Sequence, residues 1–194
     1  LNPLDGNLLT TGTFKEGNTS WICTVDGANQ SNIYPRVYST IEVTSGKWYA
    51  ECKITEEDGS SGVGISARTA ISGTDYMGVS AYDYVYYHDG KKINGGFPAA
   101  SYGTTWDGGD IIGVALDMDN LAVYFALNGT WQDSGDPTSG GSKTGAAYTI
   151  TAPASTPNGA YKFGIGTQGD ANQTQGVWNF GSPPYANSSS VADG

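Results

Sequence analysis

Residues 108–129 carry the clearest alternation of side-chain type in the chain. Apolar residues fall at every second position on both sides of a short polar stretch: Ile112, Val114 and Leu116, then Leu121, Val123, Phe125 and Leu127. A period of two places one row of side chains on one face of a strand. The polar stretch between the rows is rich in Asp and Asn, which favour turns. The pattern predicts an antiparallel hairpin facing one core, with another layer close to the small residues Gly113 and Ala115 on its opposite face.

The composition extends this β pattern to the whole chain. The 194 residues include 29 Gly, 13 Tyr and 5 Trp, which favour turns and strands over helices. No window shows the sustained i, i+3, i+4, i+7 spacing of an amphipathic helix. The sequence predicts an almost entirely β domain, with a hairpin turn at Asp89–Gly90 and further strands within residues 8–14, 20–25, 37–43, 47–54, 62–66, 148–152, 161–167 and 177–181.

The end of the domain is indicated by proline. Pro183 and Pro184 cannot continue a central strand, and a soft, Ser-rich stretch follows them. We expect a single domain over residues 1–186 and a flexible linker over residues 187–194. Because the chain begins with leucine rather than methionine, we also expect it to be part of a larger polypeptide.

The charge of the chain argues against two classes of partner. The net charge is −10, with only nine Lys and Arg residues in total. Nucleic acid and anionic membranes require clustered cations, and the sequence has no basic stripe. It also has no apolar stretch long enough to span a bilayer. We expect no nucleic-acid partner, no membrane insertion, and a location on a virion or outside the cell.

Catalytic chemistry has few candidate residues. His88 is the single histidine, and no Gly-x-Ser-x-Gly elbow accompanies it. A glycoside hydrolase, which we keep as an alternative, needs two carboxylates that face each other across a cleft. Glu51 lies within a predicted strand, whereas Glu56, Glu57 and Asp58 are adjacent in one turn. The sequence therefore favours a non-catalytic domain without a cofactor.

Two groups of residues have both a chemical and a structural interpretation: an Asp/Asn group suited to a metal ion or to a turn, and the two cysteines. Asp117, Asp119 and Asn120 offer oxygen ligands to a hard cation such as Ca²⁺, but the same residue types form hairpin turns. We expect the turn, and no metal site. Cys23 and Cys52 either form a disulfide, if their strands are neighbours at bonding distance, or serve as small buried apolar side chains.

Aromatic residues in or beside predicted loops are the more informative set, and they are interleaved with Asn, Gln, Asp and Ser. Aromatic rings stack on sugar rings or anchor a peptide, while the polar side chains take hydroxyl or backbone groups. Trp131 is the strongest single candidate, because it begins the Gly/Ser-rich segment 130–147, which we expect to be mobile. The set comprises Tyr34, Tyr76, Tyr82, Tyr84, Phe97, Tyr102, Trp106 and Trp131.

Four strand motifs resemble the SPRY domain family, in the order found in that family. They are GKWYAECKI (46–54), GVGIS (62–66), GDIIGVALDMDNLAVYFALNG (109–129) and FGIGTQG…VWNFG (163–181). The resemblance implies an antiparallel β-sandwich of the concanavalin A-like, SPRY-type jelly-roll shape. The stretch 128–139 and the Gly/Ser/Thr-rich composition also resemble SPRY-like modules of bacteriophage and other viral structural proteins.

The resemblance further implies a binding surface made by loops at one end of the sandwich. The matching loops are 26–35, 68–76 and 168–176, and the last has none of the aromatic anchors typical of protein-binding members. We therefore expect a non-catalytic module that binds a carbohydrate, on a viral or secreted protein. The alternatives are a protein-interaction module for a peptide or a neighbouring virion subunit, and a glycoside hydrolase-like domain. The candidate ligand-binding residues are Asn29, Gln30, Asn32, Tyr34, Arg68, Asp75, Tyr76, Trp131, Gln168, Asp170, Asn172 and Gln173.

Overall fold

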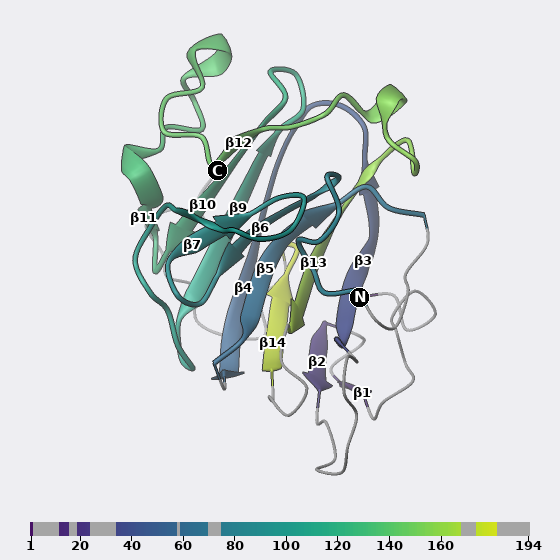
Figure 1. The fold of residues 1–194 in the computed structure, drawn as a ribbon, viewed down its shortest axis with the longest axis vertical. Helices are drawn as coiled ribbons and strands as arrows, with labels where there is room; N and C mark the ends of the chain where they lie inside the picture. Colours follow the sequence, from purple (N-terminus) through teal and green to yellow (C-terminus); the bar gives the residue numbers. More distant parts are fainter. Residues whose placement is uncertain are drawn as a thin grey trace.

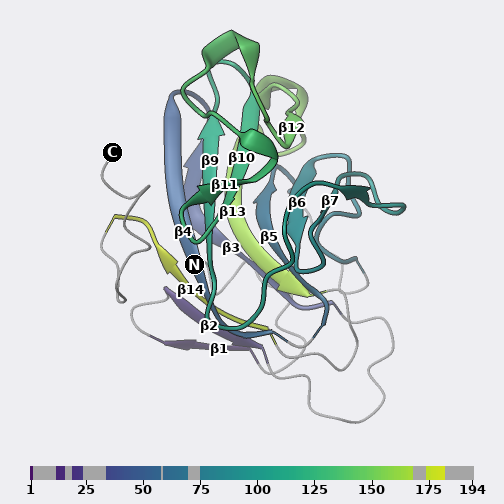
Figure 2. The same cartoon turned by 90° about the vertical axis from the view of Figure 1, so that its left-hand side faces the viewer.

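The structure is a computed structural model, and it describes residue 1 and residues 12–15, 19–23, 34–57, 59–69, 75–167 and 174–181. These residues form two antiparallel sheets packed face to face (Figures 1 and 2). Within them, helical structure is limited to three short 3-10 turns, at Gln132–Ser134, Gly140–Ser142 and Pro153–Ser155. No helix in the described ranges is long and apolar enough to cross a membrane. The prediction of an all-β sandwich is confirmed.

Sheet A contains the central hairpin and the first and last described strands of the chain. Its strands lie in the order β1 (Gly12–Lys15), β2 (Ser20–Cys23), β14 (Thr174–Asn179), β4 (Lys47–Glu57), β9 (Ile111–Asp117), β10 (Ala122–Leu127) and β11 (Thr130–Trp131), with β12 (Tyr148–Thr149) also paired to β10. Sheet B has the order β3 (Arg36–Val43), β13 (Tyr161–Thr167), β5 (Ser61–Ser66), β6 (Asp83–Tyr87), β7 (Lys91–Ile93) and β8 (Ala100–Ser101).

The predicted hairpin is β9 and β10, and its register sets the core. Val114 lies opposite Phe125 and Leu116 lies opposite Val123, so one row of each strand faces sheet B. These four side chains are buried in the main apolar cluster, and Leu121 at the turn packs against it. The parity prediction is therefore confirmed.

The opposite face of the hairpin is covered, as the small residues predicted. At Gly113 an added Cβ would lie 2.6 Å from the hydroxyl oxygen of Tyr49. Ala115 packs with Tyr124 and Ala146, the latter from the 130–147 segment. Small side chains on this face leave room for a tyrosine ring and for a third layer of chain.

Several element boundaries differ from those predicted. The closing strand β14 begins at Thr174, three residues before the predicted 177–181, and it ends at Asn179. The predicted strand 148–152 shortens to the two residues of β12, after which the chain turns into a 3-10 turn. The predicted boundary at residue 186 and the linker 187–194 lie outside the described residues.

The cysteine alternatives are resolved for one of the two residues. Cys52 is a free cysteine, fully buried between the sheets, where it acts as the small apolar side chain that its strand position suggested. The side chain of Cys23 lies outside the described part of the structure. Because Cys52 is free, it forms no disulfide with Cys23.

Candidate functional site

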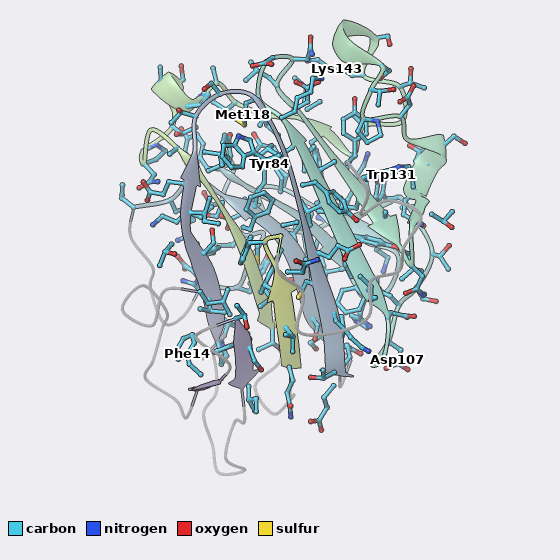
Figure 3. All side chains as sticks on the ribbon, turned by 180° about the vertical axis from the view of Figure 1, so that it is seen from behind. Phe14, Tyr84, Asp107, Met118, Trp131 and Lys143 are labelled. Carbon is cyan, nitrogen blue, oxygen red and sulfur yellow. The ribbon has the colours of Figure 1, made fainter. Side chains whose placement is uncertain are left out.

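The predicted ligand-binding residues do not form one surface. Four of them, Tyr34, Arg68, Asp75 and Tyr76, come together beside sheet B. Trp131 belongs to β11 at the far edge of sheet A, at the opposite end of that sheet from Phe14 of β1 (Figure 3). The sequence left open whether Trp131 lies with the loop residues; the structure separates it from them, because β11 pairs with β10 and not with any strand of sheet B. The other predicted residues lie outside the described ranges: Asn29, Gln30, Asn32, Gln168, Asp170, Asn172 and Gln173.

Three aromatic rings form a continuous row at the first surface, which we call the aromatic cluster (Tyr34, Tyr76 and Phe97). The ring of Tyr34 meets that of Tyr76 edge to face, with centroids 5.8 Å apart. The ring of Phe97 lies 5.6 Å from that of Tyr76 and is tilted against it. Phe97 is 53% exposed, which is unusual for so large an apolar side chain. The row therefore ends in an apolar ring that faces solvent.

The path of the chain after β5 explains how these rings meet. Ser66, the last residue of β5, pairs with Lys162 at one end of β13. Tyr34 lies at the other end of β13, because the amide of Thr167 donates to the carbonyl of the next residue, Pro35. Tyr76 nevertheless contacts Tyr34, so residues 75–77 lie back at that end of β13, on the outer face of sheet B. Met77 is buried on that face.

Hydrogen bonds and packing hold this returning segment in place. Met77 packs with Tyr38, Val85, Tyr87 and Ile93, and the hydroxyl of Tyr87 donates to the carbonyl of Met77 at 2.7 Å. The amide of Gly96 donates to the carbonyl of Gly78 at 2.9 Å, which joins the loop of Phe97 to the segment of Tyr76. The aromatic cluster therefore rests on a buried apolar patch and on paired backbone.

A charged network lies next to the cluster. Arg68 donates to the carboxylate of Asp75, and its other terminal nitrogen lies 3.6 Å from the buried carboxylate of Asp83. Asp83 also accepts from the Ser66 hydroxyl at 2.7 Å and from the amide of Gly78 at 3.1 Å. Burial raises the pKa of Asp83 above its usual value, although these donors and Arg68 oppose the shift. The network fixes both ends of the segment that carries Tyr76.

Arg36 is the second arginine of this region, and it is almost fully buried. Its guanidinium donates to the carbonyl of Tyr34 at 3.3 Å. Burial lowers the pKa of Arg36, and the carboxylates of Asp83 and Asp75 counteract that effect. Arg36 thus holds the backbone of Tyr34, whose ring is held separately by its contact with Tyr76.

A second surface lies on the outer face of sheet A, and we call it the outer groove. The rings of Tyr49 and Trp131 meet edge to face there, with centroids 6.1 Å apart. The groove has a volume of about 510 Å³, and it is lined by Lys47, Trp48, Tyr49, Ala115, Leu116, Asp117, Trp131, Pro137 and Thr138.

The segment 130–147 is folded against the sheet, so the expectation of a mobile excursion is wrong. The amide of Ala147 donates to the carbonyl of Val123, and the amide of Asp136 donates to the carbonyl of Thr144. Gln132 is buried and accepts from the amide of Thr104 at 2.8 Å. Its Gly and Ser residues permit tight turns, and these turns place Ala146 on the sheet and leave Trp131 half-buried.

Comparisons with known proteins identify the fold. No protein-family model matches the chain. The E3 ubiquitin-protein ligase RKP of Arabidopsis thaliana is 34% identical over 88 residues, which are 45% of this chain and 7% of that protein. The SPRY domain of human HERC1 superposes with a TM-score of 0.66 at 15% identity, covering 94% of this chain and 98% of that domain. Another human SPRY domain gives a TM-score of 0.61 at 17% identity, covering 90% of this chain and 99% of that domain.

The chain has the SPRY-domain fold. This confirms the resemblance inferred from the four strand motifs. The chain spans only a small part of the curated relative, so that protein's activity is not transferred to it. The further resemblance to phage and other viral modules stays a prediction.

The single histidine, His88, contacts two residues of the β-sandwich, Glu57 and Trp106. Its Nδ1 atom lies 3.8 Å from the carboxylate of Glu57, and its ring meets Trp106 edge to face. Glu57 in turn accepts from the amides of Ser60 and Ser61 at 2.8 and 3.0 Å, closing the turn before β5. Glu57 therefore serves the backbone of a turn through its side chain, but the turn position predicted for Glu56 and Glu57 is wrong, because both residues lie in β4 and pair with β14.

The carboxylates weighed as catalytic or metal-binding groups also have local partners. Glu51 is buried and accepts from the Tyr49 hydroxyl at 2.9 Å. Asp117 accepts from the amide of Asn120 at 3.0 Å within the hairpin turn, and Asp119 accepts from the amide of Gly46 at 2.9 Å, which joins this turn to the one between β3 and β4. Across the described ranges, no three His, Cys, Asp or Glu side chains are grouped so as to hold a metal ion.

Sequence reasoning missed the most exposed member of the aromatic cluster. Phe97 was counted among the loop aromatics but not among the binding residues. Its local signal is the sequence Gly95–Gly96–Phe97–Pro98, in which both glycines adopt positive φ, a conformation that presents the following side chain on a tight turn. Only the tertiary contact with Tyr76 connects this loop, between β7 and β8, to the one after β5.

Proposed function

We propose that this SPRY-type domain is a non-catalytic module that binds a peptide segment of a partner protein through the aromatic cluster. The observation that carries the proposal is the exposed ring of Phe97, supported from behind by Tyr76 and Tyr34. Aromatic residues and arginine are the types enriched at the energetic centres of protein interfaces. The predicted loop 168–176 lacks an aromatic anchor, and in this proposal Phe97 supplies it from another loop.

Preorganisation supports the same function. The segment carrying Tyr76 is held by the Arg68–Asp75 ion pair and by the packing of Met77, so little side-chain order remains to be gained on binding. Covering the exposed ring of Phe97 would contribute on the order of 1–2 kcal/mol. With two or three further contacts, a short peptide would bind with a Kd on the order of 10⁻⁴–10⁻⁶ M.

Carbohydrate binding, the leading expectation from the sequence, is less well supported. A sugar needs several hydrogen-bonding groups beside the stacking ring, and Arg68 and Asp75 already bind each other. The relatives that share this fold give no support to a glycan ligand. From the acidic composition and the resemblance to viral modules, we also propose a location on a virion or outside the cell.

The proposal is tested by selecting binders from a displayed library of peptides against the isolated domain and measuring the affinity of the best. Phe97→Ala and Tyr76→Ala should each weaken binding by about tenfold or more, as expected for interface anchors. Trp48→Ala is the matched control, because Trp48 is also exposed, at 44%, but belongs to the outer groove.

Two results would contradict the proposal. The first is a selection in which no peptide loses affinity in either cluster variant. The second is saturable binding of neutral oligosaccharides, lost in Tyr76→Ala, together with no binding of any selected peptide, which would restore the glycan hypothesis.

A further inference from the structure

The outer groove lies on sheet A, whereas the aromatic cluster lies beside sheet B, and the two differ in the side chains that line them. Its lining is mostly apolar: Tyr49 and Trp131 from two strands, Pro137 from the segment that crosses the sheet, and Ala115 and Leu116 from β9. Its volume of about 510 Å³ falls within the range of about 300–1,000 Å³ typical of ligand sites. The groove is therefore large enough for a few residues of an extended peptide.

The polar atoms around the groove select among ligands. The indole N–H of Trp48 donates to the carbonyl of Ser45 at 2.8 Å, and the hydroxyl of Tyr49 donates to Glu51 at 2.9 Å. The indole N–H of Trp131, by contrast, has no hydrogen-bond acceptor within the described residues. The groove thus offers aromatic and apolar surface together with the unpaired N–H of Trp131, beside the Lys47 ammonium group that pairs with Asp117. A sugar, with many hydroxyl groups, would leave most of them without partners here.

A proline-containing segment matches this pattern. Prolines present apolar rings and backbone carbonyl acceptors and have no N–H to satisfy. Such segments adopt the extended polyproline II conformation before binding, so they lose little entropy in an aromatic groove. The free N–H of Trp131 can donate to one of the carbonyls.

Carboxylates around the groove favour a cationic ligand. Lys47, which lines the groove, is paired with Asp117, which offsets its positive charge. Asp119 lies near Lys47, at the turn between β9 and β10. Asp136 adjoins Pro137 and accepts from the amide and hydroxyl of Thr138, which lowers its pKa and keeps it ionised at neutral pH. Together with the chain's net charge of −10, these groups would attract Lys or Arg and repel acidic peptides.

We infer that the outer groove is a second binding site, for an extended, proline-containing peptide segment flanked by Lys or Arg. Tyr49, Trp131 and Pro137 pack against the proline rings, the Trp131 indole donates to a ligand carbonyl, and Asp119 and Asp136 attract the flanking cations. The site is separate from the aromatic cluster, and it stands whether or not the cluster binds a partner.

The test uses three pools of synthetic peptides of about seven residues, a length suited to a groove of this type. The first pool has alternating prolines with Lys or Arg at both ends. The second replaces each proline by alanine, and the third replaces each basic residue by glutamate. Binding is followed by NMR through the indole N–H signals of the domain, with the buried Trp106 and Trp178 as internal references.

We expect the first pool to shift the Trp131 signal saturably. The second and third pools should bind at least about tenfold more weakly than the first, because each lacks one recognition element. Trp131→Ala and Pro137→Ala should each weaken binding to the first pool about tenfold. Pro137→Ala is included because it leaves the Tyr49–Trp131 contact intact. Phe97→Ala should leave the affinity unchanged, which separates this site from the aromatic cluster.

The inference is overturned if the first pool leaves the Trp131 signal unmoved at millimolar concentration, or if the alanine pool binds equally well. It is also overturned if Phe97→Ala abolishes the shift, because the peptides would then occupy the other surface. Saturable shifts with a neutral oligosaccharide and none with the first pool would assign the groove to glycans instead.

Discussion

The ring of Phe125 in sheet A packs against the ring of Tyr86 in sheet B, with their centroids 5.7 Å apart. Tyr102, in the segment between β8 and β9, meets both rings at 6.1 and 5.5 Å. All the surface of Phe125 is buried, so these contacts join the two layers at the centre of the sandwich.

Phe125→Ala should therefore lower the free energy of unfolding by ~3–5 kcal/mol, through lost transfer energy and the cavity left behind. Urea denaturation followed by tryptophan fluorescence measures the change. Phe97→Ala removes the same atoms from a half-exposed position and should change stability by no more than about 0.5 kcal/mol. Equal losses in the two variants would show that the core assignment is wrong.

Gly64 gives a test of how closely the strands of sheet B are packed. It lies opposite Gly164 in the register of β5 and β13, and an added Cβ would lie 2.1 Å from the carbonyl oxygen of Tyr84. Gly64→Ala should cost about 3 kcal/mol or more, because a backbone atom must move. Gly141→Ala, whose Cβ would meet nothing closer than 3.8 Å, should be nearly neutral. Comparing the urea midpoints of the two variants checks this, and a stable Gly64→Ala protein would contradict it.

Asp117 should make the stability depend on pH in the acid range. Burial tends to raise its pKa, but hydrogen bonds from Lys47 and Asn120 outweigh burial and bring the pKa below the ordinary value of 3.8. A carboxyl with a lowered folded-state pKa stabilises the protein fully above pH 3.8 and loses that contribution as the pH falls through the folded-state value. The gap in Tm between the parent and Asp117→Asn should therefore be largest near neutral pH and should shrink below pH 3.8.

Lys47→Gln is the companion variant for the same measurement. It removes the cation that pairs with Asp117, and so it should also reduce the acid dependence of Tm. A gap between the parent and Asp117→Asn that widens as the pH falls would have the wrong sign for this pair and would refute the assignment.

Cys52 should be chemically inert in the folded protein. Burial raises the pKa of its thiol well above the usual value, and the thiolate is the reactive form. In a Cys23→Ser background, a thiol-specific reagent such as Ellman's reagent should fail to label the native protein at mildly alkaline pH and should label it fully in urea. Stoichiometric labelling of the native protein would show that the region around Cys52 opens to solvent.

Much of the fold could be predicted from local patterns. The alternation in residues 111–127 placed four core side chains correctly, because the period of two is a property of any strand and needs no partner. The Asp89–Gly90 reversal marked the β6–β7 hairpin for a similarly local reason, since Gly90 takes a positive φ there. Boundaries were less certain, because the start of β14 at Thr174 depends on pairing with Glu57 across the sheet.

The candidate site could be predicted only in part. Tyr34, Arg68, Asp75 and Tyr76 were chosen together from the loops that the SPRY resemblance indicated, and they do meet. Phe97 was not chosen with them, because its link to the cluster is a contact between two loops that no local pattern encodes. The surface to which Trp131 belongs could not be predicted either. Its Gly/Ser-rich surroundings suggested mobility, whereas hydrogen bonds to β10 hold them on the sheet.

The sequence by itself determined the class of the fold, the parity of the central hairpin and the strongly negative charge, since each depends on residue type and spacing along the chain. The tertiary structure alone decided which loops share a surface. The packing of Met77 on sheet B brings Tyr76 to Tyr34, and the fold of residues 130–147 brings Trp131 to Tyr49. Both contacts join residues that are more than 40 positions apart. Their stability comes from burial and pairing across the sandwich, which the order of residues does not specify locally.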